Sequence, residues 1–391
     1  MSIMQSTLSS QVNALLQRLP DPPPAKADPA VQTPIDDGDQ GSKQPPFELP
    51  YTPHFPLDFP RGGNGPSQPT YTDADLYGPQ DPNDPESPEG PNPDDIDQDS
   101  IGDCYFVATL SAMAGSEEGR AQIEDAITYD PATGNFTVTL YGKDANGNPV
   151  EQQVTVTQAD VQDNIDRNGG SRVDNGGGPL WPAVMEAAYA KMHYQDATAN
   201  GQTPDPRLDG GYGPGSADKL DANGKPVQAV NPDGTPKFDS NGNPVYEQVE
   251  VGGISGGFAT DAYFTLTGKD STTFQAPSGD GKFGNLVTTV RALQIQQALE
   301  NGQPVTVAVA PESGGEPKDG LAGGHQYSVQ SIYRDETTGE WMVVLRNPWA
   351  NNANDEGISL VDGDQRGDAT ITVPLDSIHT DGYQGFVIGD E

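Results

Sequence analysis

The stretch Gln98-Asp-Ser-Ile-Gly-Asp-Cys104-Tyr-Phe-Val-Ala-Thr-Leu-Ser-Ala-Met-Ala114 passes from polar residues into a helix-length block of small and apolar side chains. Because this block is apolar on all sides, it predicts a helix that is buried on every face and ended by Gly115. The helix begins at the only cysteine of the chain. A helix N-terminus stabilises a thiolate, which makes Cys104 a candidate nucleophile, and an inert buried thiol is the alternative.

The composition excludes several classes of protein. The chain has 391 residues, a formal net charge of −38, 33% hydrophobic residues, 47 Gly and 37 Pro. This balance excludes a membrane-spanning protein, a coiled coil and a compact helical bundle. So acidic a surface repels phosphates, and we therefore expect no nucleic-acid partner. We also expect no membrane partner, and we expect a monomer. A single cysteine also excludes an intramolecular disulfide framework and a cysteine-rich zinc site.

The composition changes along the chain. Residues 1–93 are rich in Pro and Asp and lack a sustained apolar period after residue 19, so this N-terminal extension is predicted to be disordered. The first 19 residues are consistent with a frayed amphipathic helix or with a non-cleaved export signal. A second turn-rich stretch, at about 200–248, repeats Asp-x-Asn-Gly-x-Pro and is interpreted as a surface insertion of hairpin turns.

The remaining patterns predict an α+β fold. Residues 136–141 and 150–156 alternate around Asp144-Ala-Asn-Gly147, which indicates a hairpin. Helices are predicted at 180–193 and 286–300, and strands at 304–310, 326–333 and 341–346. A Cys-bearing helix in the first half and a His-bearing sheet in the second half point to two lobes with a cleft between them.

A cysteine nucleophile needs a base. The four histidines are His54, His193, His325 and His379. His54 falls in the predicted disordered extension, and His193 ends an amphipathic helix. His325 follows two glycines and opens a predicted strand, where the backbone can approach a site closely.

Three further side chains complete a candidate site. Asn347 follows the next predicted strand and is placed to orient the imidazole of His325, as in a Cys-His-Asn triad. Trp349 is placed to exclude water from that hydrogen bond. Gln98 precedes Cys104 at a spacing that lets its amide donate to an oxyanion beside the Cys104 backbone N–H.

Several motifs resemble the calpain family of cysteine endopeptidases, in the family's order. The blocks are Gln98-Asp-Ser-Ile-Gly-Asp-Cys104-Tyr, Leu180-Trp-Pro-Ala-Val-Met-Glu-Ala-Ala-Tyr-Ala-Lys191, Gly252-Gly-Ile-Ser-Gly-Gly257, Gly324-His-Gln-Tyr-Ser-Val329 and Leu345-Arg-Asn-Pro-Trp349. The resemblance implies a papain-like two-lobed protease core, with a first subdomain at 94–268 and a second at 269–391. It also implies peptide hydrolysis through a thioester acyl-enzyme.

The resemblance assigns a role to each residue. Cys104 becomes the nucleophile, His325 the general base and then acid, and Asn347 the orienting residue. Gln98 becomes the oxyanion donor, and Trp349 the shield over the His–Asn bond. Asp99, Tyr105 and Ala350 stand where the family usually has Gly, Trp and Gly, and none of these changes removes a catalytic atom.

Calcium dependence stays open at this point. Asp95 matches an acidic ligand of the family's first calcium site. The ligands expected after Trp349 are replaced by Asn351, Asn352 and Asn354, with Asp355 and Glu356 out of phase. We therefore treat Ca²⁺ as an optional cofactor with Asp95 as its candidate ligand.

Two other functions use the same residues. One is a Cys-His acyltransferase of transglutaminase type, and the other is a catalytically silent interaction scaffold. Protein or peptide substrates are expected for the protease. The composition, with its repeated Asp-x-Asn-Gly-x-Pro turns, suggests a bacterial protein. A lone free thiol suits a reducing cytoplasm, and export as an effector is the alternative; no Sec-type leader is recognised.

Overall fold

The structure is a computed structural model. It describes residues 70–77, 90–173, 177–199, 210–213, 216–218, 225–231, 234–238, 243–250, 253–277, 281–310, 321–352, 369–380 and 383–390. Within these residues, no helix is both long and apolar enough to cross a membrane.

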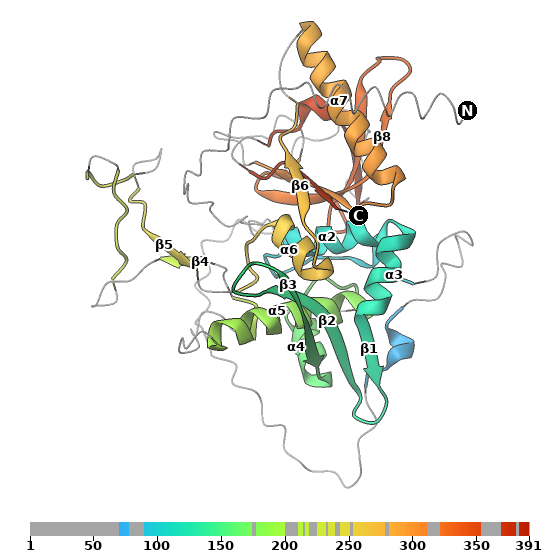
Figure 1. Ribbon diagram of the computed structural model, residues 1–391, viewed down its shortest axis with the longest axis vertical. Coiled ribbons are helices and arrows are strands. Elements are labelled where there is room, and N and C mark those ends of the chain that lie inside the picture. The colour runs from blue at the N-terminus through green and yellow to red at the C-terminus, as the bar shows by residue number, and fades with distance from the viewer. Residues whose placement is uncertain are drawn as a thin grey trace.

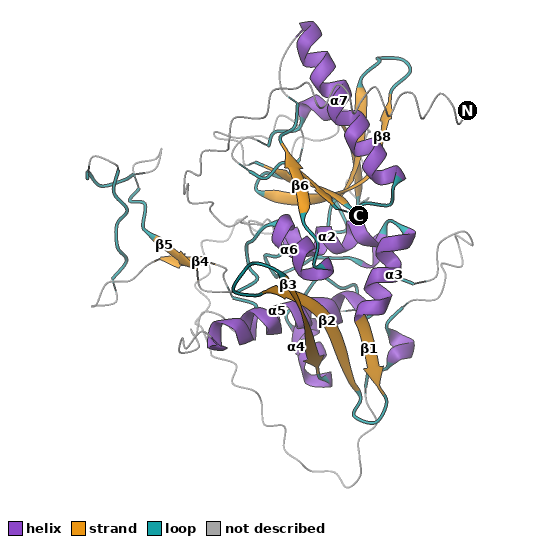
Figure 2. Cartoon of the chain, viewed as in Figure 1, coloured by secondary structure: helices purple, strands orange, loops and turns teal. Residues whose placement is uncertain are grey.

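Two hydrophobic cores organise the described residues. One draws its buried side chains from between Leu76 and Leu266, and the other from between Phe274 and Ile388. We call the parts built around them the first lobe and the second lobe. Figure 1 shows the first lobe below and the second lobe above, and Figure 2 shows that helices and strands occur in both. The predicted α+β class is confirmed.

The first lobe combines helices with a small antiparallel sheet in the order β1-β2-β3. Its elements are η1 (Asp73–Asp75), η2 (Pro93–Asp95), α2 (Cys104–Ala114), α3 (Glu117–Ala126), β1 (Ile127–Asp130), β2 (Asn135–Lys143), β3 (Pro149–Val156), α4 (Gln158–Asp166), α5 (Trp181–Ala199), β4 (Ser216–Asp218), β5 (Gln248–Glu250) and α6 (Ala259–Thr267).

The second lobe is a six-stranded antiparallel sheet in the order β10-β9-β8-β7-β11-β6, with α7 packed on it. Its elements are β6 (Ser271–Phe274), α7 (Gly281–Glu300), β7 (Val305–Val309), β8 (His325–Arg334), β9 (Trp341–Arg346), β10 (Thr370–Pro374), η4 (Leu375–Ser377) and β11 (Phe386–Gly389).

Helix α2 lies between the lobes. All its residues are buried, as its apolar composition predicted, and Gly115 follows its last residue. It packs against α3, α5 and α6 of the first lobe and against β7 and β8 of the second lobe, which places it centrally in Figure 1. A helix apolar on every face is suited to this position because it has neighbours on all sides.

The predicted hairpin is confirmed. β2 pairs with β3 from Phe136↔Val156 to Lys143↔Pro149. In the turn, the backbone N–H groups of Asn146 and Asn148 both donate to Asp144 Oδ1 at 2.8 Å. Gly147 takes a φ of 83°, a conformation that favours glycine.

Two short parts of the predicted disordered extension, residues 70–77 and 90–93, lie among the described residues, and the first of them packs on the first core. Leu76 is buried in the first core, and its carbonyl accepts a hydrogen bond from the Trp181 N–H at 3.1 Å. Tyr71 packs on the same core and exchanges hydrogen bonds with Gln158. Short aromatic and aliphatic segments within a Pro-rich stretch can thus order by docking on a core formed elsewhere. Residues 1–69 and 78–89, with His54, lie outside the described residues.

The turn-rich stretch divides into two parts. Residues 210–213 belong to the first lobe, where Tyr212 packs on the core and Gly211 O accepts from the Ile254 N–H at 2.9 Å. Beyond them, β4 pairs with β5, and the described residues between these strands stand away from both lobes (Figure 1). Here three backbone hydrogen bonds form a closed ring. The Ala229 N–H donates to Val245 O, the Val245 N–H donates to Lys237 O, and the Lys237 N–H donates to Ala229 O.

Candidate active site

Cys104 is the first residue of α2 and is fully buried. The preceding residue, Asp103, is the N-cap, and its carbonyl accepts the first helical hydrogen bonds, from Phe106 N–H at 2.7 Å and Val107 N–H at 3.2 Å. The thiol therefore stands where the helix dipole and the first backbone N–H groups favour negative charge.

His325 is the first residue of β8 and is also fully buried. It pairs with Val309 of β7. Gly324 precedes it with a φ of 69°, and the Gly324 N–H donates to Val309 O at 2.8 Å. The chain thus makes a left-handed turn into the sheet immediately before the imidazole, and such a turn favours glycine.

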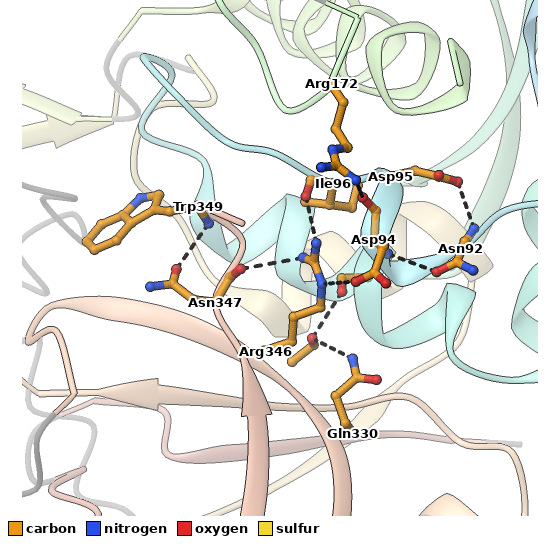
Figure 3. A network of polar contacts seen from close by, with 11 residues as sticks. Asn92, Asp94, Asp95, Ile96, Arg172, Gln330, Arg346, Asn347 and Trp349 are labelled. Carbon is orange, nitrogen blue, oxygen red and sulfur yellow. Dashed lines mark hydrogen bonds and ion pairs between the residues drawn. The ribbon is translucent and has the colours of Figure 1, made fainter. Parts of the chain in front are cut away.

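Asn347 holds the imidazole in one tautomer. Its Oδ1 lies 2.9 Å from His325 Nε2 and also accepts the Trp349 backbone N–H at 3.0 Å. Figure 3 shows the latter bond. Because the Trp349 N–H can only donate, the atom it meets is the amide oxygen, so the hydrogen of the neutral ring lies on Nε2. Nδ1, which has no hydrogen-bond partner among the described atoms, is then the basic nitrogen.

Trp349 covers a face of the imidazole. The two rings stack with centroids 3.9 Å apart and an interplanar angle of 24°. The turn that presents Trp349 continues into Ala350, which has a φ of 52°. An L-residue other than glycine is strained there, and this is the position at which the resembling family has Gly.

Burial dominates the electrostatics of His325. It lowers the pKa of the imidazole to about 4, while the hydrogen bond with Asn347 acts in the opposite direction. The imidazole is therefore neutral at pH 7 when the thiol is neutral, as a proton acceptor must be.

Hydrogen bonds join the two lobes near these residues. Ser111 Oγ of α2 lies 3.0 Å from Ser328 Oγ of β8. Measured along the two elements, this contact is about 10 Å from Cys104 and about 10 Å from His325. A second bond lies in the segment that leads to the nucleophile, where the Gln98 backbone N–H donates to Pro348 O at 2.7 Å. The structure thus brings the Gln98–Cys104 segment and the Asn347–Trp349 turn together.

Gln98 is buried beside this junction. Its Nε2 donates to Ile101 O at 2.7 Å, in the loop that leads to Cys104. This bond uses one of the two amide hydrogens and leaves the second for another acceptor. Asp99, which follows it, is exposed.

A buried acidic pair behind the nucleophile was not found from the sequence. Glu186 of α5 is fully buried, and its Oε2 accepts the Gly170 N–H at 2.6 Å and the Asn164 side-chain amide at 3.0 Å. The buried carboxylate of Asp103 lies next to it. Burial raises the pKa of Glu186, against these hydrogen bonds. The signal in the sequence was a lone carboxylate within the apolar run of α5.

Asp95, the candidate calcium ligand, lies at the end of η2. Its Oδ2 accepts the indole N–H of Trp181 at 2.7 Å and the Asn92 backbone N–H at 2.8 Å. In the part of the chain that the structure describes, no group of three or more His, Cys, Asp or Glu side chains could hold a metal ion. Calcium also binds backbone and amide carbonyl oxygens, so the role of Asp95 as a calcium ligand stays a prediction. Asn354, Asp355 and Glu356 lie outside the described residues.

Comparison with known proteins adds one finding. Residues 81–209 match the family model described as calpain family cysteine protease. The matched segment includes Gln98 and Cys104 and ends before His325 and Asn347. A search of curated proteins gave no significant match. This match and the two-lobed α+β fold are consistent with the papain-like core of the calpain family of cysteine proteases.

Proposed function

We propose that this cysteine protease is an endopeptidase that hydrolyses peptide bonds through a thioester on Cys104. The observation that carries the proposal is the hydrogen bond of 2.9 Å between His325 Nε2 and Asn347 Oδ1. It leaves Nδ1 as the basic nitrogen of a buried imidazole, in the lobe that packs on the Cys104 helix.

In the first half of the reaction, His325 Nδ1 takes the thiol proton and Cys104 Sγ attacks the scissile carbonyl carbon. The carbonyl oxygen gains the negative charge, and the second Nε2 hydrogen of Gln98 and the Cys104 backbone N–H are its proposed donors. When the C–N bond breaks, the protonated imidazole gives its proton to the leaving amine. The product is a thioester between Cys104 and the acyl part of the substrate.

In the second half, His325 Nδ1 takes a proton from water, and the resulting hydroxide attacks the thioester carbon. The C–S bond breaks, Cys104 regains a proton and the acid product leaves. Asn347 keeps the ring in the tautomer and orientation needed in both halves, while the Trp349 ring limits the access of water to the His–Asn bond. No step of this mechanism uses calcium.

Three assays test the proposal. We expect the wild-type protein to cut casein and a peptide blocked at both ends, and we expect an epoxysuccinyl inhibitor to label Cys104, detected by mass spectrometry. Cys104→Ala should lose both the cleavage of these substrates and the labelling by the inhibitor, and it should keep the circular dichroism spectrum of the wild type. Cleavage of casein by Cys104→Ala would overturn the assignment of the nucleophile.

The alternatives give different results in the same assays. An acyltransferase would transfer the acyl group to an added primary amine and release little free acid. A silent scaffold would neither cleave casein nor react with the epoxysuccinyl reagent faster than a free thiol. Cleavage of unblocked peptides alone would show an exopeptidase rather than an endopeptidase.

A further inference from the structure

The junction between the lobes is held in part by polar contacts rather than by a shared hydrophobic core. The buried apolar residues form two separate clusters, one in each lobe. Between them lie hydrogen bonds such as Ser111–Ser328 and Gln98 N–H to Pro348 O. The relative position of the lobes therefore depends in part on directional interactions, beside the packing of α2 against both lobes.

Arg346 makes several of these interactions with one side chain. It is the last residue of β9, and only 2% of its side chain is exposed. Its Nε donates to Asp94 Oδ1 at 3.0 Å and its Nη2 donates to Ile96 O at 2.9 Å, both in the first lobe. Its Nη1 reaches the carbonyl of Asn347, in its own lobe, at 3.4 Å. Figure 3 shows the guanidinium between these three partners.

The ion pair does not explain why this arginine is buried. The Asp94 side chain is 72% exposed, so its attraction to Arg346 is weakened by water. Burial lowers the pKa of Arg346, which reports the cost of removing the guanidinium from water, and Asp94 offsets only part of that effect. Arg172 adds a second guanidinium, whose Nη1 donates to Asp94 O at 3.2 Å. Because burying this cation costs free energy, the position of Arg346 is better explained by the geometry of its hydrogen bonds than by a net gain in stability.

The partners of Arg346 lie next to the proposed catalytic groups. Ile96 is two positions before Gln98, and Asn347 directly follows Arg346. The hydrogen bond from Gln98 N–H to Pro348 O runs beside the guanidinium contacts. The same side chain thus links the segment that leads to Cys104 with the turn that orients His325.

We propose that Arg346 is a positioning residue, which sets the His325–Asn347 pair against Gln98 and Cys104 by tying β9 to residues 94–96. The proposal rests on the proposed cysteine protease function. Planarity and several fixed donors suit Arg to this task, whereas Lys has one flexible ammonium group. A misplacement of about 1 Å in an active site can lower the rate about 100-fold.

The test compares four variants with the wild type. Arg346→Met keeps the apolar stem and removes all the donors, Arg346→Lys keeps the charge, and Asp94→Asn removes only the exposed partner's charge. Arg334→Met is the matched control, because Arg334 is exposed at the far end of β8 and bonds to Gly339 O in its own hairpin. Each variant is measured below its Tm for kcat, for KM and for the pH dependence of Cys104 alkylation by iodoacetamide.

We expect Arg346→Met to lower kcat about 100-fold with KM changed less than about threefold, since the substrate's binding groups remain. The pH dependence of Cys104 alkylation in this variant should shift toward that of a thiol without a neighbouring base, because the imidazole is no longer positioned against the sulfur. Arg346→Lys should recover part of kcat, Asp94→Asn should lose less than about tenfold, and Arg334→Met should match the wild type.

Two results would overturn the positioning role. One is a folded Arg346→Met with a wild-type kcat and alkylation profile. The other is a lower Tm with the alkylation profile unchanged, which would show a purely structural contribution. If Arg346→Met does not fold, Arg346→Lys decides: a wild-type kcat and alkylation profile in this variant would overturn the proposal, and a lower kcat with a shifted profile would support it.

Alkylation also separates this proposal from the proposed function. One outcome is that the wild-type protein cleaves no peptide while the pH dependence of Cys104 alkylation still changes when Arg346 is substituted. That result would refute the endopeptidase assignment and support the positioning role. Cleavage by wild type and Arg346→Met at equal rates would do the reverse.

Discussion

The buried pair of Asp103 and Glu186 makes the stability of this protein depend on pH in an unusual direction. Both side chains are fully buried, and they lie next to each other. Two carboxylates in contact cannot both ionise without strong repulsion, so the pair holds one proton where separate carboxyls would hold none. Burial raises the pKa of Glu186 above its ordinary value of 4.5, and the hydrogen bonds from Gly170 and Asn164 only reduce that rise.

The sign of the effect follows from proton counting. Above about pH 5 the unfolded chain has released both protons, whereas the folded pair keeps one until the pH passes its raised pKa. The folded state then binds about one proton more than the unfolded state, so the free energy of unfolding falls as the pH rises. The slope for one proton is about 1.4 kcal/mol per pH unit, starting near about pH 4.5 and ending at the folded pKa.

The variant Glu186→Gln removes this titration. The side-chain amide that the substitution introduces can still donate to Asp103, and its oxygen can still accept from the Gly170 N–H, so the packing is largely kept. Urea unfolding of both proteins at about pH 5, 6 and 7 measures the difference in the free energy of unfolding. We expect that difference to move in favour of the variant by about 1.4 kcal/mol for each pH unit below the folded pKa.

A control and a refuting result complete this experiment. Glu151→Gln, at an exposed position of β3, controls for the general effect of removing one negative charge. If the curves for wild type and Glu186→Gln run parallel from about pH 5 to about pH 7, the pair holds no additional proton and the reasoning is wrong.

Three further predictions concern the site and its surroundings. Asn347→Ala leaves the buried Nε2–H of His325 without its acceptor, which costs about 1–3 kcal/mol. We therefore expect kcat in casein cleavage to fall about 5- to 150-fold. An unchanged kcat would contradict the orienting role. Ala350→Gly should raise the free energy of unfolding by about 1 kcal/mol, because φ at this position is 52°; urea unfolding measures it, and a loss of stability would show that the turn is not strained. Because Asp95 Oδ2 already accepts two hydrogen bonds, we expect the same Tm and casein cleavage in excess chelator and in millimolar calcium; a rise of several degrees with calcium would establish a binding site.

Elements whose reason to form is local could be predicted from the sequence. Helix α2 is an apolar block ended by glycine, and the β2–β3 hairpin carries its own Asp-Asn-Gly turn. The strands β7, β8 and β9 were visible as β-branched or alternating runs. The candidate residues Cys104, His325 and Asn347 were recognisable because they sit at the ends of these elements, where a helix or strand meets a turn.

Other elements depend on partners that lie far away in the chain. The strands β1, β6, β10 and β11 are only four or five residues long, and each is stabilised by its neighbour in the sheet rather than by its own pattern. The segment 70–77 is polar and Pro-flanked in sequence, yet Leu76 and Tyr71 dock on the first core. Docking of this kind leaves no periodic signal, because it uses single side chains.

The sequence by itself determined which groups could perform the chemistry, since a thiol at a helix N-terminus, a histidine after paired glycines and an Asn-Pro-Trp turn are local features. The tertiary structure decided how the two halves meet. Arg346 and Asp94 are 252 residues apart, and Glu186 reaches Asp103 from a different helix. Burial creates these pairs, because a charged or acidic side chain excluded from water must find a partner wherever the fold provides one.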